Sequence, residues 1–584
     1  MIIQINYRFL LILSVIVLQS CSKTIQGELI ITNVNIINVK TGEVNQNKDI
    51  IIDGDKITSI VATKSNTTYK SENVIDGSDK YLIPGLWDMH THTWWGYEEF
   101  FPLLIANGVT GIQEMSGDLT KVKFIKNQIA KGEIVGPEII SSGRIIDGKP
   151  AIYNHASAAG TPEEGRNFVR KQKAAGADFI KVYSLLSRDT YLAIADECKQ
   201  LKIPFYGHVP DAVPLDVAVK AGQKSIEHFF GILEFCSSRN QHYHSVFSGE
   251  VVDTTLTGKN LWIKMLDFPV KTHDEKKVDP LINMLSESAT WVSPSNVMTR
   301  AYSHGGDEFI VNDARVDYMP DYLTKNWGKR KRSDLYYSTW KSYYSLSLSL
   351  MKPMLDGGVK FLAATDYANP YCFPGFSLHD ELEIFVENGF TPQQALQTAT
   401  INPAKFLGLE NDIGTVDINK IANLVLLSKN PLNDISNTRK IDNVIVRGEP
   451  FSKDQLQNKL DSILIHNRLP KIREELMIVI EQKGIESALN EYENLKETKT
   501  DLYNFDKYQL DMLGEELMDQ DRYMDALKIF QKNIDEFPNY ASGYESVGDA
   551  YLSLKDTLRA EEFYKKALGK NIGSRILRKL EQLK

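Results

Sequence analysis

Two histidines separated by one residue follow an apolar stretch in the sequence Asp88-Met89-His90-Thr91-His92. Residues two positions apart on a β-strand point to the same side, so His90 and His92 can direct both imidazoles toward one ion. Neutral imidazole is a common ligand of zinc and of similar divalent ions. The spacing therefore predicts a metal site at the end of a strand.

Four more residues of suitable chemistry lie at or next to the ends of other short apolar runs, in the order Lys181, His208, His228 and Asp366. A single histidine at a strand end is more often a hydrogen-bonded structural group than a ligand. An ordered set of imidazoles and a carboxylate is harder to explain in that way. The set predicts one site to which several strands contribute.

Eight apolar runs separated by spacers of helical length are the elements that must position these side chains. The runs end at His90, Ile112, Ser141, Val182, His208, His228, Ser293 and Asp366. Eight alternating units predict an α/β fold of the (β/α)8 TIM-type barrel, here over residues 84–412. In such a barrel the C-terminal ends of the strands carry the catalytic groups.

Segments of a different pattern flank this region. Residues 27–83 and 413–450 alternate apolar and polar side chains between turn signals, which predicts a β-sandwich formed by both flanks together. Residues 453–584 are charged, leucine-rich and helical in period. Gly514, Ala526 and Phe530 align with Gly548, Ala560 and Tyr564 at an offset of 34 residues, which is similar to tetratricopeptide repeats; coincidental helical hairpins are the alternative.

The composition narrows the range of partners. The 584 residues carry a formal net charge of −9, so the chain offers no overall basic surface for nucleic acid, and a small molecule or short peptide is the expected substrate. The helical repeats would be the place for a protein partner.

The N-terminus predicts export. Residues 1–20 have the short apolar core of a secretory signal, and Leu18-Gln19-Ser20-Cys21 resembles a bacterial lipobox, in which Cys21 would be lipidated. We therefore expect a membrane-anchored lipoprotein of the outer membrane or facing the periplasm, held by lipid alone. An ordinary signal peptide with a chance cysteine is the alternative.

Several motifs of the chain match one known family. They are Pro84-Gly-Leu-Trp-Asp-Met-His-Thr-His92, Asp178-Phe-Ile-Lys-Val-Tyr183, Gly207-His-Val209, Ser225-Ile-Glu-His228, Ala364-Thr-Asp366, Leu378-His-Asp-Glu-Leu382 and Ala399-Thr-Ile-Asn-Pro-Ala404. In these motifs the chain resembles the amidohydrolase superfamily, in particular its imidazolonepropionase-like and Xaa-Pro dipeptidase branch, over about residues 27 to 450.

The resemblance implies a centre of two divalent metal ions, with zinc as the first expectation. His90, His92 and Asp366 would hold one ion, and His208 and His228 the other. Lys181 would bridge them after carboxylation by CO2, because an ammonium cannot be a ligand whereas a carbamate offers two oxygens. An ion-paired lysine is the alternative, although an unpaired buried ammonium is costly.

Further roles follow from the same resemblance. Asp366 would accept the proton of a water that the ions turn into hydroxide, and would pass it to the leaving amine. His155 and Tyr183 stand where the family places groups that contact substrate and could bond a carbonyl oxygen or a carboxylate. Ordinary hydrogen bonding is the alternative for both.

The expected function is metal-dependent hydrolysis of an amide-type C–N bond, with Xaa-Pro or a related dipeptide as first substrate. A cyclic amide of the imidazolone type is the second candidate. A third is an inactive barrel in a repeat-mediated interaction protein, which the complete ligand set disfavours. Insertions around residues 234–266 and 298–344 leave the substrate open, because such loops shape the pocket.

Overall fold

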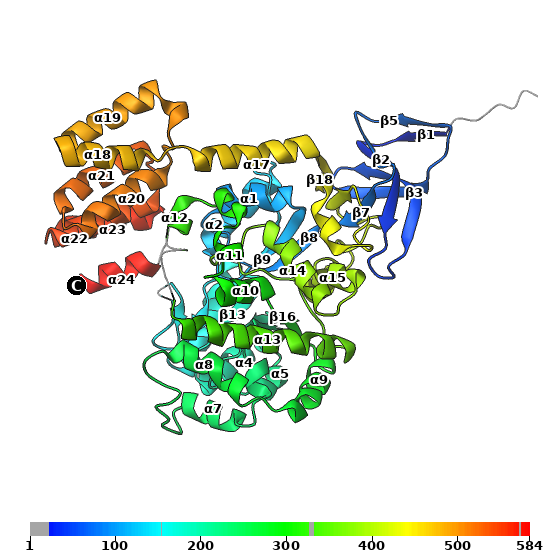
Figure 1. The fold of residues 1–584 in the computed structure, drawn as a ribbon, viewed down its shortest axis with the longest axis horizontal. Helices are drawn as coiled ribbons and strands as arrows, with labels where there is room; N and C mark the ends of the chain where they lie inside the picture. The colour runs from blue at the N-terminus through cyan, green and yellow to red at the C-terminus, as the bar shows by residue number, and fades with distance from the viewer. Residues whose placement is uncertain (1–22, 154, 326, 328–331, 571–573, 584) are drawn as a thin grey trace, which may run out of the picture.

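The computed structural model describes residues 23–583, apart from 154, 326, 328–331 and 571–573. The expected signal peptide (residues 1–20) and Cys21 lie outside the described residues. Figure 1 shows three regions along the longest axis: a β-rich region, a central α/β region, and a helical C-terminal region at the opposite end.

The β-rich region joins both flanks of the chain in one sheet. Its strand order is β19-β18-β17-β7-β2-β3-β4, and β6 also pairs with β2. The strands are β2 (Leu29–Ile37), β3 (Val44–Asp53), β4 (Lys56–Ala62), β6 (Asn73–Asp76), β7 (Tyr81–Pro84), β17 (Leu424–Leu427), β18 (Ile441–Val446) and β19 (Glu449–Ser452). The antiparallel pairing of β7 with β17 joins segments more than 300 residues apart. A separate pair, β1 (Lys23–Gln26) and β5 (Thr67–Lys70), packs Ile25 against Ile30 and Ile51.

The central region is built on a curled parallel sheet surrounded by helices. Its strands run in two series, β10-β9-β8 and β12-β11-β13-β14-β15-β16. They are β8 (Leu86–Thr91), β9 (Val109–Glu114), β10 (Glu138–Ser141), β11 (Ile146–Asp147), β12 (Ser157–Ala158), β13 (Ile180–Val182), β14 (Phe205–Gly207), β15 (Ser225–Glu227) and β16 (Trp291–Ser293). Apolar residues such as Val109, Ile180 and Ile226 are buried, as expected where helices cover a parallel sheet.

Single parallel bridges connect the two series. Ser142 pairs with Phe179, Val292 with Phe361, and Thr91 with Tyr367. Residues 359–366, expected as the eighth strand, lie between β16 and β8 and bond to both through the backbone, although not in a continuous ladder: Leu362 N–H donates to the Val292 carbonyl and Asp366 N–H to the His90 carbonyl, each at 2.9 Å. Two amides of this segment donate to acceptors other than the backbone carbonyls of the neighbouring strands. Thr365 N–H donates to Asp88 Oδ1 at 3.1 Å, and Ala363 N–H donates to the Thr398 carbonyl at 3.0 Å.

The two expected insertions are helical. The first contains α6 (Ile232–Phe235), α7 (Asn240–Phe247) and α8 (Leu261–Lys271). The second contains α10 (Asn296–His304), α11 (Glu308–Val311), the 3-10 helix η2 (Ala314–Tyr318), α12 (Asp321–Thr324) and the first half of α13 (Asp334–Asp356). Helix α13 packs against both α8 and α10, so the two insertions share one body.

The C-terminal region is entirely helical where it is described. It begins with α17 (Lys453–Arg468) and continues with α18 (Ile472–Lys483), α19 (Ile485–Thr498), α20 (Lys507–Asp519), α21 (Tyr523–Glu536), α22 (Ala541–Ser553), α23 (Thr557–Lys570) and α24 (Ser574–Gln582). Gly514 meets Phe530 so closely that a Cβ would lie 2.2 Å from the ring, and Gly548 meets Tyr564 in the same way. The pairs α20–α21 and α22–α23 thus share a contact at an offset of 34 residues.

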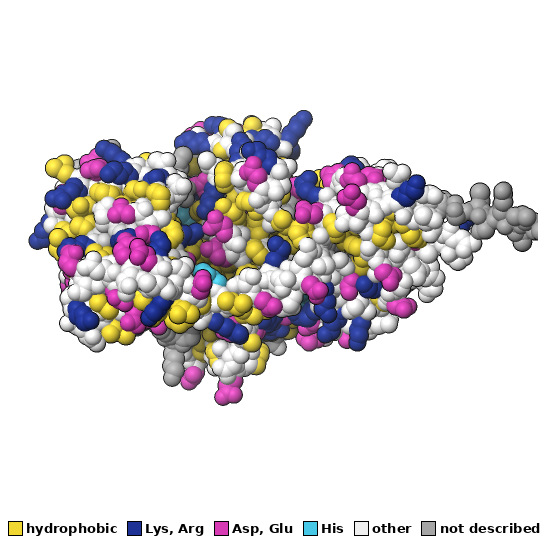
Figure 2. All heavy atoms as spheres, turned by 90° about the horizontal axis from the view of Figure 1, so that it is seen from above, with side chains coloured by type: hydrophobic (Ala, Val, Ile, Leu, Met, Phe, Trp, Pro, Cys, Tyr) yellow, Lys and Arg dark blue, Asp and Glu magenta, His cyan; other side chains and the backbone are white. Residues whose placement is uncertain are grey.

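The surface carries both signs of charge. Figure 2 shows basic and acidic side chains intermixed over the face that it presents, without an extended area of one sign. No helix among the described residues is both long and apolar enough to cross a membrane.

Candidate metal and catalytic site

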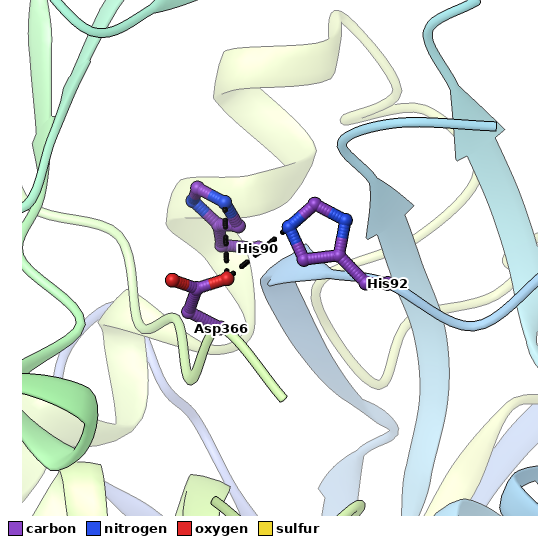
Figure 3. Close-up of side chains that lie close together, drawn as sticks. All are labelled: His90, His92 and Asp366. Atoms are coloured by element: carbon purple, nitrogen blue, oxygen red, sulfur yellow. Dashed lines mark ion pairs between the residues drawn. The ribbon is translucent and has the colours of Figure 1, made fainter. Parts of the chain in front are cut away.

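Three of the expected ligands meet where β8 ends. Ligand atoms of His90, His92 and Asp366 lie within 4.8 Å of one another, and Figure 3 shows both imidazoles facing the carboxylate. Oδ1 of Asp366 is 3.5 Å from Nε2 of His90 and 3.2 Å from Nε2 of His92. One oxygen therefore faces two imidazole nitrogens of the His-x-His pair.

The remaining expected ligands lie on the other side of Asp366 and His90. Oδ2 of Asp366 is 3.6 Å from Nε2 of His228. The rings of His228 and His208 are 5.2 Å apart between centroids, and Nζ of Lys181 is 3.4 Å from Nε2 of His90. The structure thus brings together all six residues: His90, His92, Lys181, His208, His228 and Asp366.

Burial sets the protonation of this cluster. It lowers the pKa of His228 to about 3, and together with the charge of Lys181 it holds the pKa of His90 and of His208 well below the usual value. Burial would raise the pKa of Asp366, but His90 and His92 outweigh it and hold that pKa below its ordinary value. Neutral imidazoles around an ionised carboxylate are the protonation states that bind a divalent cation.

The hydrogen bonding of two buried nitrogens, one in His228 and one in Lys181, is explained better by a bound cation than by partners within the protein. Nδ1 of His228 is buried and has no hydrogen-bond partner among the described residues. Lys181 is 1% exposed, burial lowers the pKa of its amine to about 8, and its hydrogen bond within the described chain is to an imidazole. A buried polar group in that state is costly unless another partner is bound.

Glu227 is the residue of the site that the sequence reasoning did not single out. Its Oε2 accepts a hydrogen bond from Nδ1 of His90 at 2.8 Å, and its carboxylate is fully buried. This bond turns Nε2 of His90 toward Asp366, which is how carboxylates orient histidine ligands. Its place directly before His228, at the end of β15, was the available signal.

Other buried groups hold the backbone of the site. Glu114 accepts hydrogen bonds from the amides of Thr93 and Trp94, and its Oε1 is 3.8 Å from Nδ1 of His92. Tyr343 of the second insertion donates to the carbonyl of His228 at 3.2 Å. These contacts fix the turns on which the two histidines lie.

The backbone at two strand ends adopts an uncommon conformation. His228 has φ +62° and Asp366 has φ +56°, in the left-handed region that residues other than glycine seldom occupy. Residues held in this region cluster at functional sites, where surrounding packing maintains the strain.

The two weaker candidates lie further out. The ring of Tyr183 stacks on His208 at 4.0 Å between centroids, and its hydroxyl is close enough to that of Tyr153 for each ring to affect the other's pKa. His155 is exposed and stacks on Tyr153 at 5.3 Å. Tyr183 therefore contacts the ligand cluster directly, whereas His155 reaches it through Tyr153.

Comparisons with known proteins agree with this geometry. The profile of the amidohydrolase family matches residues 81–451. The imidazolonepropionase of Bacillus cereus (strain G9842) is 24% identical over 395 residues, which are 66% of this chain and 84% of that protein.

Among solved structures, a Xaa-Pro dipeptidase with bound methionine in the active site has a TM-score of 0.52 and 19% identity, and the match covers 74% of this chain and 100% of that chain. A bottromycin amidohydrolase has a TM-score of 0.59 and 19% identity, with 75% and 90% covered. At these identities the structural likeness shows the fold alone.

Proposed function

The chain belongs to the amidohydrolase family, and on that premise we propose that it is a metal-dependent hydrolase of an amide-type C–N bond in a small molecule or dipeptide. The observation that supports this most is the position of Asp366. Its two carboxylate oxygens face His90 and His92 on one side and His228 on the other, at 3.2 to 3.6 Å. A carboxylate with imidazoles on two sides suits a centre of two cations.

The metal ions would be held by His90, His92 and Asp366 at one position and by His208 and His228 at the other. When bound, divalent ions of this kind polarise a carbonyl and lower the pKa of water. Asp366 lies between the two positions, where it would accept the proton of the attacking water and return it to the leaving nitrogen. The Tyr183 hydroxyl is the nearest candidate to bond the substrate's carbonyl oxygen.

Lys181 would join the two positions as a carbamate. Its neutral amine attacks the carbon of CO2, a C–N bond forms, and one proton leaves. Burial supports this step, because a pKa of about 8 leaves more neutral amine than an exposed lysine has. The product presents carbamate oxygens beside the imidazoles of His90 and His208, in place of a buried ammonium whose hydrogen bond is to His90 and whose charge is stabilised by Glu227 and Asp366.

Xaa-Pro or a related dipeptide is the first substrate that we propose, supported by the likeness of the fold to a Xaa-Pro dipeptidase. A cyclic amide is the second candidate, because the chain matches the Bacillus cereus imidazolonepropionase over 84% of the length of that protein. An inactive barrel remains the alternative if the purified chain holds no metal.

The proposal also includes three structural features: closure of the barrel, repeat-like helix pairs and a lipid anchor. The bridges at Phe179, Phe361 and Tyr367 support closure of the curled sheet into a (β/α)8 barrel. The shared glycine–aromatic contacts support tetratricopeptide-like pairs in the helical region. Export with a lipid on Cys21 is proposed from the sequence alone, and mass spectrometry of the N-terminal peptide tests it.

The decisive experiment is a substrate screen with metal-reconstituted protein. Xaa-Pro dipeptides, N-acyl amino acids and imidazolone-type lactams are compared for the wild type and for Asp366→Asn. We expect the variant to keep most of its metal, by elemental analysis, and to lose turnover by about 10²-fold or more. Near-normal turnover in Asp366→Asn would remove Asp366 from the reaction, and less than one tightly held metal per wild-type chain would favour the inactive barrel.

A further inference from the structure

The helical C-terminal region is connected to two loops of the site through α1 (Tyr97–Ala106) and through a segment of the second insertion. The first loop, residues 92–96, joins β8 to α1 and begins with His92. The second loop, residues 367–375, follows Asp366 and leads to α14 (Phe376–Glu387). Between these loops and the helical region lies part of the second insertion, residues 314–325, which we call the bridging segment.

The bridging segment is fixed to the helical region on one side. Tyr322 stacks on Tyr508 of α20 with ring centroids 3.9 Å apart and planes inclined by 25°. Asp321 forms an ion pair with Arg473 of α18, in which both side chains are at most 20% exposed. Lys325 and Glu515 of α20 are 3.0 Å apart, and Figure 1 shows α12 beside α20.

On its other side the bridging segment contacts both loops. The ring of Tyr322 meets Trp95 of the first loop edge to face at 6.3 Å. The guanidinium of Arg315 lies over Phe373 of the second loop at 4.9 Å, and Tyr318 contacts Phe376 at 5.0 Å. One short segment therefore touches the chain on both sides of the His90, His92 and Asp366 cluster.

Helix α20 also contacts the first turn of α1, directly after the first loop. Lys507 Nζ is 3.1 Å from Glu98 Oε2, and the Tyr508 hydroxyl donates to Glu99 Oε1 at 3.4 Å. Both acceptors lie in the first turn of α1. Tyr508 thus holds the first loop from two sides, through α1 and through Tyr322.

We infer that the helical region is a positioning element of the site, which holds the loops after His92 and Asp366 through Tyr508 and the bridging segment. Its role is then intramolecular: it holds the two loops that follow His92 and Asp366. Tyr508 and Tyr322 are positioning residues and need not touch substrate. The effect expected on KM and kcat rests on the proposed function, whereas the effect expected on the conformational stability of the two loops does not.

The test compares Tyr508→Ala with Tyr508→Phe in the full-length chain by hydrogen–deuterium exchange and mass spectrometry. Loss of the stacked ring should speed exchange of residues 92–101 by about threefold to tenfold, the factor expected for one aromatic contact. Tyr508→Phe keeps the ring stacked on Tyr322 and loses only the long hydrogen bond to Glu99, so its exchange should lie closer to the wild-type rate than to that of Tyr508→Ala. With any substrate that the wild type hydrolyses, Tyr508→Ala should raise KM more than it lowers kcat and leave the metal content unchanged.

Two further variants separate positioning from general damage. Tyr551→Ala removes a ring that packs on Phe563 within the helical region, at 5.5 Å, and should leave residues 92–101 unchanged. Asp321→Asn breaks the pair with Arg473 from the insertion side and should reproduce the faster exchange even if Tyr508→Ala fails to fold. Exchange at the wild-type rate in both loops of Asp321→Asn and of Tyr508→Ala would overturn the inference. So would an acceleration in Tyr551→Ala as large as that in Tyr508→Ala. Because exchange needs no substrate, a wild type without hydrolytic activity would count against the proposed function only.

Discussion

Glu227 shows how one side chain sets the direction of a ligand. It accepts a hydrogen bond from Nδ1 of His90 at 2.8 Å and another from the Ser225 hydroxyl at 2.5 Å, and it has no exposed surface. The carboxylate thereby keeps the proton of His90 on Nδ1 and leaves Nε2 free to face Asp366. Such partners commonly affect metal affinity as strongly as the ligands themselves.

We expect Glu227→Gln to weaken metal binding or turnover by about 10- to 100-fold, because an amide favours neither the tautomer nor the charge that His90 requires. Competition with a metal chelator measures the affinity. Asp49→Asn is the matched control, since Asp49 is an equally buried carboxylate that bonds Tyr69 and Thr63 in the β-rich region. Equal metal affinity in Glu227→Gln and the wild type would show that the bond is only structural.

Lys181 makes a separate prediction at the same scale. Lys181→Ala should lose metal and activity together, and short carboxylates such as acetate or formate should restore part of both, because they supply the missing oxygens. In the wild type, ¹³C-bicarbonate should give a carbamate signal in the ¹³C spectrum that the variant lacks. Full activity in Lys181→Ala without any added carboxylate would contradict the carbamate bridge.

At the scale of elements, the first insertion carries a buried carboxyl that should make stability depend on pH. Glu234 of α6 is 6% exposed and accepts the Gly231 amide at 2.7 Å, and burial raises its pKa to about 7. Asp211 nearby is raised to about 8, mainly by burial, and its Oδ2 has no hydrogen-bond partner among the described residues. Both groups are therefore protonated in the folded chain at a pH where they are ionised in the unfolded chain.

A raised acid pKa stabilises the fold below the unfolded value, and this contribution is lost as the pH rises through the folded value. We therefore expect the thermal midpoint to fall between pH 5 and pH 8.5, with a contribution from Glu234 of order 2–3 kcal/mol. Glu234→Gln should flatten this dependence because it keeps an acceptor and removes the titration. Glu250→Gln, at an exposed position of the same insertion, should keep the wild-type slope. An unchanged or steeper slope in Glu234→Gln would refute the assignment.

At the scale of the whole molecule, the candidate site joins segments of the chain that are far apart. Its residues come from β8, β13, the ends of β14 and β15, and the segment before residue 367. An ion bound there holds these segments together only in the folded state, and at about a thousandfold excess over its Kd it adds about 4 kcal/mol to stability.

Removal of metal should therefore lower the melting temperature by several degrees, and added zinc should restore it. Differential scanning calorimetry before and after chelation measures the shift. In His92→Ala the melting temperature should change less on chelation than in the wild type, because one expected ligand is missing. The His92 side chain is 27% exposed, so its loss should disturb the fold little. Identical melting curves with and without chelator would show that no stabilising ion is held.

The sequence by itself determined the kind of fold and the candidate ligands. Strand and helix periods are local properties, and side chains at the C-terminal ends of parallel strands converge wherever such strands form a curled sheet. His90, His92, Lys181, His208, His228 and Asp366 could therefore be proposed together without coordinates. The interrupted pairing of residues 359–366 could not be predicted. It arises because the Thr365 amide donates to the Asp88 side chain and the Ala363 amide donates to the Thr398 carbonyl.

The tertiary structure alone decided which partners hold these residues. Glu227 is 137 positions from His90, and Tyr343 is 115 positions from His228, so no local pattern connects them. The contact of Tyr508 with Tyr322 likewise depends on how two separately patterned regions pack. Periodicity records which face of an element is buried, whereas the identity of the group that it meets is fixed only when the whole chain folds.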